Sequence, residues 1–190
     1  MTDANRIPRV PELEGDGIQV AYNPGLPEIE SPRGELVDHC FFRAKNGLWQ
    51  LWTQIRGARV GRFFYRWEGT DVLETPDWTP RGICWGPERN CGESWGTGEE
   101  DFVHAPYVLE HEVPLVLYYG GGPSDTGHSQ ICAAISDDGL HFERLTYGRN
   151  RSQLFAGPGV ARDPMVIHAG TCYALYYAAN DGERGIIAVR

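Results

Sequence analysis

Three short segments carry the residue types best suited to acid–base chemistry. They are Asp38-His39-Cys40, His104-Ala105-Pro106 and Arg162-Asp163-Pro164. Each segment precedes a leucine that is followed by an aromatic residue, and the spacing is nearly constant. Asp38 and His104 lie 13 residues before theirs, and Asp163 lies 12 before its own. We therefore expect these three residues to occupy equivalent places in a structural repeat.

The repeat has a chemical consequence if the fold is a β-propeller. The innermost strands of all blades line one central channel and run in the same direction, so their starting ends meet at one mouth of that channel. Residues distant in sequence then face one cavity. Two carboxylates and a histidine delivered to a single pocket would make a plausible site for polar chemistry.

The elements that would position these residues are short alternating strands separated by turn signals. Residues 44–47 end in Asn46-Gly47, a strong hairpin signal, and residues 136–139 (SDDG) supply a second turn. No amphipathic helix is predicted. The expected strands form three series: 41–43, 48–55 and 60–67, then 107–110, 115–119, 129–135 and 142–145, and finally 165–168, 172–179 and 185–190.

The repeat period favours a propeller over other all-β folds. The leucine–aromatic pairs begin at Leu51, Leu117 and Leu175, and such long steps suit four-stranded blades with generous loops. A β-sandwich is the alternative, because it also uses short strands and regular turns. The run 120–122 (GGG) is followed by no helix, so a phosphate-binding loop is excluded and a strand end is expected.

Two regions are predicted along the chain. Residues 1–35 form an arm rich in proline, glycine and charge, in which 17–22 could be a closing strand. Residues 36–190 form blades one to three of an all-β, partial propeller, which the family resemblance given below implies is five-bladed. The third blade lacks a fourth strand, so we expect further blades beyond Arg190, with ring completion by oligomerisation as the less favoured alternative.

The composition limits the classes of binding partner and the cellular compartment that we expect for this protein. The net charge of −9 with no basic cluster argues against nucleic acid and suits neutral partners such as sugars. The five cysteines form no CxxC pair, so we expect reduced thiols rather than zinc ligands or a disulfide framework. No signal peptide and no apolar run long enough to span a bilayer are visible. The expectation is a cytoplasmic protein without membrane partners; the oligomeric state is open.

Residues 36–190 resemble the five-bladed propeller glycoside hydrolases of families 43 and 32. The resemblance is carried by Asp38, by the segment 104–107 (HAPY), by 161–164 (ARDP) and by the turn 136–142 (SDDGLHF). Arg-Asp-Pro is typical of family 32, and family 43 carries an aspartate at the same point. His39 departs from the pattern, because relatives usually have proline there.

The resemblance implies roles for the acidic residues. Asp38 would be the base of an inverting enzyme or the nucleophile of a retaining one, since glycoside cleavage needs two carboxyl groups. Asp163 would orient substrate or tune the acid, with Arg162 binding hydroxyls or holding Asp163 ionised. The general acid would be a glutamate of a later blade, so this chain alone should have little activity. The acidic run 99–101 is the weaker fallback within the chain.

Several readings stay open at this stage. His104, Tyr107 and Trp95 are candidates for substrate contact, whereas most other aromatic residues should be core between blades. A carbohydrate-binding propeller without catalysis and a glycoside phosphorylase are the alternatives to a hydrolase. The sugar is undetermined among arabinosides, xylosides, fructosides and galactosides. No cofactor or metal is implied, although relatives can hold calcium in the channel.

Overall fold

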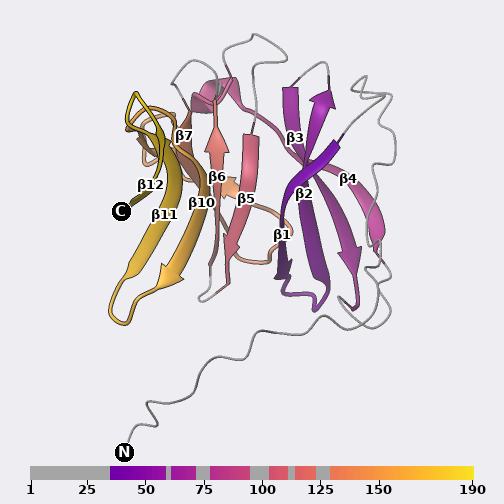
Figure 1. Ribbon diagram of the computed structural model, residues 1–190. Helices are drawn as coiled ribbons and strands as arrows, with labels where there is room; N and C mark the ends of the chain where they lie inside the picture. Colours follow the sequence, from indigo (N-terminus) through magenta and orange to yellow (C-terminus); the bar gives the residue numbers. More distant parts are fainter. Residues whose placement is uncertain (1–34, 59–60, 72–77, 95–102, 111–113, 123–128) are drawn as a thin grey trace, which may run out of the picture.

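Three antiparallel sheets stand side by side in the computed structural model (Figure 1). It describes residues 35–58, 61–71, 78–94, 103–110, 114–122 and 129–190. The expected strand at 17–22 lies outside these residues. Within them, the helical structure is one three-residue 3-10 turn, η2 (Arg89–Cys91). The prediction of an all-β fold is confirmed, and the sheets are the blades of a partial β-propeller.

Blade one is a four-stranded meander in which each strand pairs with the next. Its last strand was not predicted, because Pro80 and Gly82 weaken the strand pattern there. The strand pairs only with its predecessor, and proline is tolerated at such a sheet edge because the missing N–H leaves no broken ladder bond. The four strands are β1 (Glu35–Arg43), β2 (Trp49–Ala58), β3 (Gly61–Gly69) and β4 (Thr79–Trp85).

Blade two is built the same way, but its outer strand is divided. Two short strands, β8 and β9, both pair with β7, at opposite ends of it. The intervening residues include two of positive φ, Tyr147 and Asn150, which interrupt an extended conformation. The strands are β5 (Val103–Leu109), β6 (Leu115–Gly121), β7 (Gln130–Ser136), β8 (Glu143–Arg144) and β9 (Gln153–Ala156).

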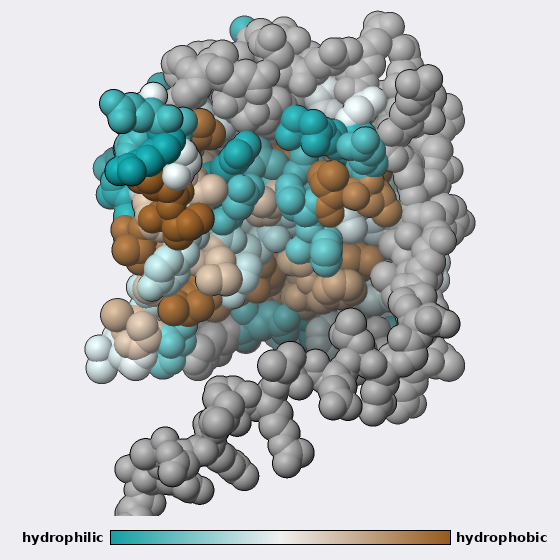
Figure 2. Space-filling model, in the orientation of Figure 1, coloured by the Kyte–Doolittle hydropathy of each residue, from teal (hydrophilic) through white to brown (hydrophobic). Residues whose placement is uncertain are grey.

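Blade three has three strands in the order β10 (Arg162–His168), β11 (Tyr173–Asn180) and β12 (Gly185–Val189). Ile187 and Val189 on β12 are exposed. Figure 2 shows hydrophobic surface on the side of the molecule where this blade lies.

The inner strands of the blades meet one another. β5 contacts both β1 and β10, so the sheets are arranged radially rather than as the two layers of a sandwich. Side chains fill the spaces between adjacent blades. Trp52 and Trp85 of blade one are buried against Leu117 and Tyr119 of blade two, which confirms that they belong to the core between blades. A second cluster joins Ile131 of blade two to blade three.

Both predicted hairpin turns form, and they touch. Gly47 adopts a φ of +86°, and the Asn46 side chain accepts a hydrogen bond from the Leu48 N–H. In the second turn, Ser136 accepts a 2.8 Å hydrogen bond from the Gly139 N–H. The Lys45 N–H donates to the Asp138 carbonyl at 2.8 Å. The two turns therefore join blades one and two at one end of the sheets.

Candidate active site

The same irregularity interrupts the inner strand of every blade. Between Leu36 and His39, three steps along β1 face two along β2, and β5 and β10 show this pattern between His104 and Tyr107 and between Arg162 and Met165. Each is a β-bulge, a device that redirects side chains and is over-represented near active sites. The segments expected just before the inner strands therefore lie inside them, at the bulges.

The three bulges surround one pocket of about 720 Å³. Asp38 and Asp163 are the carboxylates among its lining residues, and each comes from a different blade. Convergence of the inner strands thus brings together the two acidic residues predicted from sequence. The lining residues are Leu36, Val37, Asp38, His39, Ala105, Pro106, Tyr107, Asp163, Pro164 and Met165.

Asp163 occupies an unusual backbone conformation. Its φ is +56°, in the left-handed region that few residues other than glycine, asparagine and aspartate adopt. Ala105, at the same position of the β5 bulge, has a φ of +48°. Pro164 follows Asp163, and its fixed φ continues the strand without a ladder donor. The bulge holds the Asp163 carboxylate at the pocket, half exposed to solvent.

Two cationic or ionisable side chains flank the Asp163 carboxylate. His104 Nδ1 lies 3.9 Å from Oδ1, and Arg162 Nε lies 3.5 Å from Oδ2. The His104 side chain is 4% exposed and does not line the pocket. Arg162 is half exposed and lines a different pocket on the outer side of blade three. Neither side chain lines the Asp163 pocket, but both lie within 4 Å of the carboxylate that does.

Gly120 leaves the space that the His104 ring occupies. A Cβ atom added to Gly120 would lie 2.5 Å from Nε2 and 2.6 Å from Nδ1 of the imidazole ring. The neighbouring Gly121 similarly makes room for Cys132 and Glu93. β6 ends at Gly121, as the strand-end interpretation of 120–122 predicted. The glycines thus also create space for buried side chains, a function that the sequence alone did not indicate.

Tyr107 lines the pocket and also links blades two and three. Its hydroxyl donates a 2.7 Å hydrogen bond to the carbonyl of Val166 on β10. Burial raises the pKa of this phenol. The hydroxyl is therefore engaged in structure, and the ring face is the part that a ligand could contact. Trp95, the other aromatic candidate, lies outside the described residues.

His39 is a pocket residue that the sequence did not single out as functional. It lines the cavity beside Asp38, and its ring meets Phe41 edge-on with centroids 5.7 Å apart. In the sequence it stood out only as a departure from the pattern of the resembling families, whose members usually have proline there. Alternation did not reveal its exposure because the β1 bulge changes which residues face the channel.

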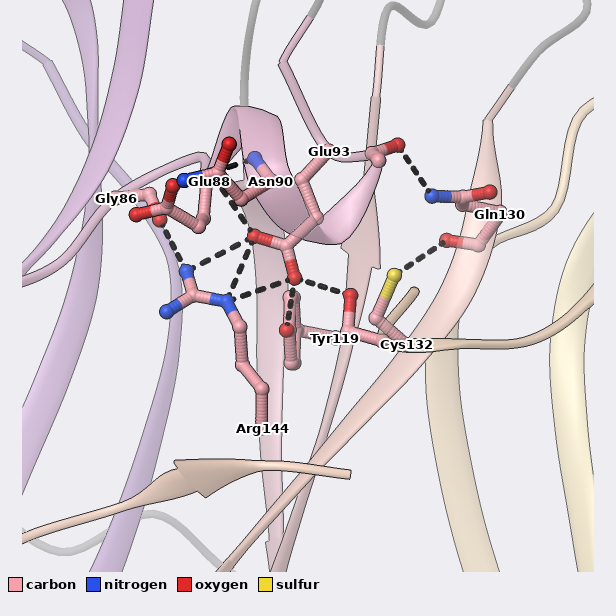
Figure 3. A network of polar contacts seen from close by, with 10 residues as sticks. Gly86, Glu88, Asn90, Glu93, Tyr119, Gln130, Cys132 and Arg144 are labelled. Atoms are coloured by element: carbon pink, nitrogen blue, oxygen red, sulfur yellow. Dashed lines mark hydrogen bonds and ion pairs between the residues drawn. The ribbon is translucent and has the colours of Figure 1, made fainter. Parts of the chain in front are cut away.

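A buried carboxylate, Glu93, joins blades one and two (Figure 3). It lies in the loop after β4, is fully buried, and forms a bidentate ion pair with Arg144 at 2.9–3.0 Å. The Tyr119 and Ser152 hydroxyls and the Glu88 N–H also donate to it. No residue of this network stood out in the sequence, so the network was missed.

Arg144 completes the connection between the blades. Its guanidinium lies 4.0 Å over the Trp85 ring and donates a hydrogen bond to the Gly86 carbonyl. Because the ion pair is buried and stacked on an aromatic ring, we interpret it as a structural link rather than part of a catalytic centre. No sequence signal distinguishes a buried loop glutamate from a solvated one.

The pocket can provide carboxylates, one imidazole and an aromatic face. Among the described residues, no group of three or more His, Cys, Asp or Glu side chains is arranged to hold a metal ion. The described helical structure includes no segment long and apolar enough to cross a membrane. All five cysteines are unpaired. The carboxylates and the imidazole of the lining are groups suited to acid–base chemistry on a polar ligand.

Comparison with known proteins supports the fold. No family model matches the sequence, and no curated protein matches it significantly. A thermostable family-43 glycoside hydrolase shares 19% identity at a TM-score of 0.58, over 84% of this chain and 49% of that one. Sucrose-6-phosphate hydrolase from Lactobacillus gasseri shares 19% identity at a TM-score of 0.62, over 82% of this chain and 31% of that one.

An α-L-arabinofuranosidase from Lactobacillus brevis is also similar, with 12% identity and a TM-score of 0.58 over 85% of this chain and 50% of its own. This chain thus spans half or less of the length of these structures. At such identities the likeness establishes the propeller fold and leaves the activity to be argued from the site.

Proposed function

We propose that this chain forms part of a glycoside hydrolase that acts on O-glycosidic bonds of an oligo- or polysaccharide. The observation that carries the proposal is the meeting of Asp38 and Asp163, from blades one and three, in one pocket. Hydrolysis of a glycoside requires a carboxylate that activates water or attacks the anomeric carbon, and a carboxylic acid that protonates the leaving oxygen.

In this proposal Asp38 is the base or nucleophile and Asp163 orients the sugar. His104 positions the Asp163 carboxylate and does not contact substrate. Its ring is buried, and its Nδ1 atom lies 3.9 Å from that carboxylate. Tyr107 offers its ring to an apolar sugar face. The three sheets would be the first three blades of a five-bladed ring, and the acid would be a glutamate of a later blade.

The neighbours favour a furanoside or fructoside among the candidate sugars. Two of the similar structures are named as an arabinofuranosidase and a sucrose-6-phosphate hydrolase. The unpaired cysteines suit a reducing compartment, and we propose a cytoplasmic location on that ground.

A phosphorylase is the second candidate, and one observation weighs against it. Such an enzyme needs basic side chains for phosphate at the reaction site, whereas the described lining of this pocket includes no lysine or arginine. A binding module without catalysis is the third candidate. It would retain the Tyr107 ring and tolerate loss of either carboxylate.

Ligand titration with matched variants separates these candidates. Methyl arabinofuranoside, xyloside, fructoside and galactoside would be added to the 190-residue chain, with binding followed by amide chemical shifts. Asp163→Asn is the informative variant, because asparagine tolerates the left-handed backbone and removes only the charge. Asp38→Asn tests the second carboxylate, and Asp137→Asn, on an exposed turn, is the control.

We expect one of the four glycosides to bind at millimolar concentration and both site variants to weaken it at least about five-fold, as loss of a charge-assisted hydrogen bond predicts. Asp137→Asn should bind as the unmodified chain does. If no glycoside binds, the carbohydrate site is wrong. If a glycoside binds and neither Asp38→Asn nor Asp163→Asn weakens it, the carboxylates are not its ligands, the hydrolase proposal fails and the binding module is favoured.

A further inference from the structure

A second pocket, of about 290 Å³, lies beside η2 and contains two arginines. Arg89 comes from η2, and Arg151 comes from the segment that leads into β9. Gly92, Ser94 and Gln130 complete its described lining. Two guanidinium groups in one hollow are notable in a chain with a net charge of −9.

The walls of this pocket are held in place by hydrogen bonds. Gln130 Nε2 donates to the Gly92 carbonyl at 2.9 Å, and the Ser152 N–H donates to the Cys91 carbonyl at 3.1 Å. The Arg151 stem packs on Gly92, where a Cβ atom would lie 3.5 Å from Cγ. Gly92 has a φ of +75°, so the backbone favours glycine under this arginine. The backbone segments that carry the two exposed arginines are thus held in place.

The nearby acidic groups are already engaged elsewhere. Glu93 is neutralised by Arg144, and the Glu88 side chain accepts a hydrogen bond from the Asn90 N–H. Within the described part of the chain, neither Arg89 nor Arg151 forms an ion pair. Neither guanidinium group therefore has a direct acidic partner among the described side chains, and a guanidinium pair is well matched to phosphate or carboxylate oxygens.

This pocket lies at the same end of blade two as the Asp163 pocket. Gln130 pairs with Gly121, which pairs with Val103 at the start of β5. With neighbouring strands about 4.8 Å apart, Gln130 is about 10 Å outward from the inner strand, comparable to one or two sugar units. Figure 1 shows η2 at the end of the sheets where β5 begins.

We propose that Arg89 and Arg151 bind an oxyanion carried on a carbohydrate, either a phosphate ester or a uronic acid carboxylate. Binding of the anion stands independently of the proposed function, and only its attachment to a sugar rests on that function. The pocket would give a glycoside-active site a preference for charged substrates.

Calorimetric or chemical-shift titration tests this inference with four probes: inorganic phosphate, glucose 6-phosphate, glucuronate and uncharged glucose. Arg89→Gln and Arg151→Gln are the site variants. Arg149→Gln is the matched control, because Arg149 is exposed on the same segment but does not line the pocket. Thermal unfolding of each variant checks that the fold is retained.

We expect saturable phosphate binding that each site variant weakens about ten-fold and Arg149→Gln changes less than two-fold. Equal losses in all three variants, or no saturable binding of any anion, would overturn the proposal. Glucose 6-phosphate or glucuronate should bind more tightly than inorganic phosphate, and the tighter of the two identifies the anion. If neither does, the sugar-linked site is refuted. Asp163→Asn should leave phosphate affinity unchanged, which separates this test from that of the proposed function.

Discussion

Replacing Glu93 by glutamine should destabilise the chain far more than its loop position would indicate. Every partner of this carboxylate is a donor in the structure: Arg144, the Tyr119 and Ser152 hydroxyls, and the Glu88 N–H. A glutamine places an NH₂ group among these donors, so either the Tyr119 and Ser152 hydroxyls must turn to accept from it or it must face the Arg144 guanidinium or the Glu88 N–H. It also leaves the Arg144 guanidinium without its counter-ion in a largely buried site.

The magnitude follows from the burial of the pair. Removing one partner of a buried ion pair costs about 3–5 kcal/mol, because the remaining charge stays desolvated. Arg144 retains Trp85 at 4.0 Å and the Gly86 carbonyl, and its side chain is 18% exposed, so we expect the lower end, about 3 kcal/mol. For a chain of this size the melting temperature should fall by about 6–12 °C.

Urea and thermal unfolding measure this effect against a matched control. Glu143→Gln removes a carboxylate from the exposed neighbour of Arg144 on β8 and should change stability by less than about 0.5 kcal/mol. Because the Glu93 pair is buried, the loss should persist at 0.5 M salt, where surface pairs are screened. Equal stability of Glu93→Gln and Glu143→Gln would refute the assignment of this network as the link between blades.

Two further predictions concern positions where the structure is specific. Gly120→Ala should cost about 1–3 kcal/mol by overpacking the buried His104 ring, whereas Gly185→Ala, with open space around it, should be near neutral; similar urea midpoints for both would contradict the packing argument. The His141 ring, followed by the backbone N–H groups of His141 and Leu140, holds the pKa of Asp138 well below its usual range. Its stabilising effect is therefore complete above the unfolded pKa of about 3.9 and is lost as the pH falls towards the folded value. Asp138→Asn should thus be less stable than the unmodified chain at pH 7 by a margin that shrinks at pH 3, and a margin independent of pH would disprove the explanation.

The sequence predicted the fold well because its signals are local. Strand alternation and the Asn46-Gly47 turn depend on neighbouring residues, and all ten strands expected between residues 41 and 190 are present in the structure. The two strands that were missed, β4 and β9, are outer strands. Proline and glycine obscure β4, and β9 is a four-residue segment that takes the place of an interrupted strand beside β7.

The buried polar network could not be predicted for a different reason. Arg144 and Ser152 lie 51 and 59 residues after Glu93 in the chain. The sequence around each of the three residues is ordinary and polar. Their burial depends on how blade one packs against blade two, which is a tertiary property. A loop between two blades is enclosed by both, and a carboxylate there is tolerated only because a guanidinium and several donors reach it.

The candidate site shows that counting residues along a repeat does not by itself identify structurally equivalent positions. Aligning the leucines made Asp38 equivalent to Asp163, yet the bulges align Asp38 with Pro164 and Val37 with Asp163. The offset arises from the second strand of each blade. In blade three, the residue after the aligned leucine, Tyr176, pairs with the end of the bulge, whereas in blade one the pairing residue is Thr53, one position later than Trp52. Val37 also lacks the positive φ of Asp163. The two carboxylates therefore enter the pocket from different steps of their strands and from different backbone conformations, whereas strict repetition would have made their surroundings alike.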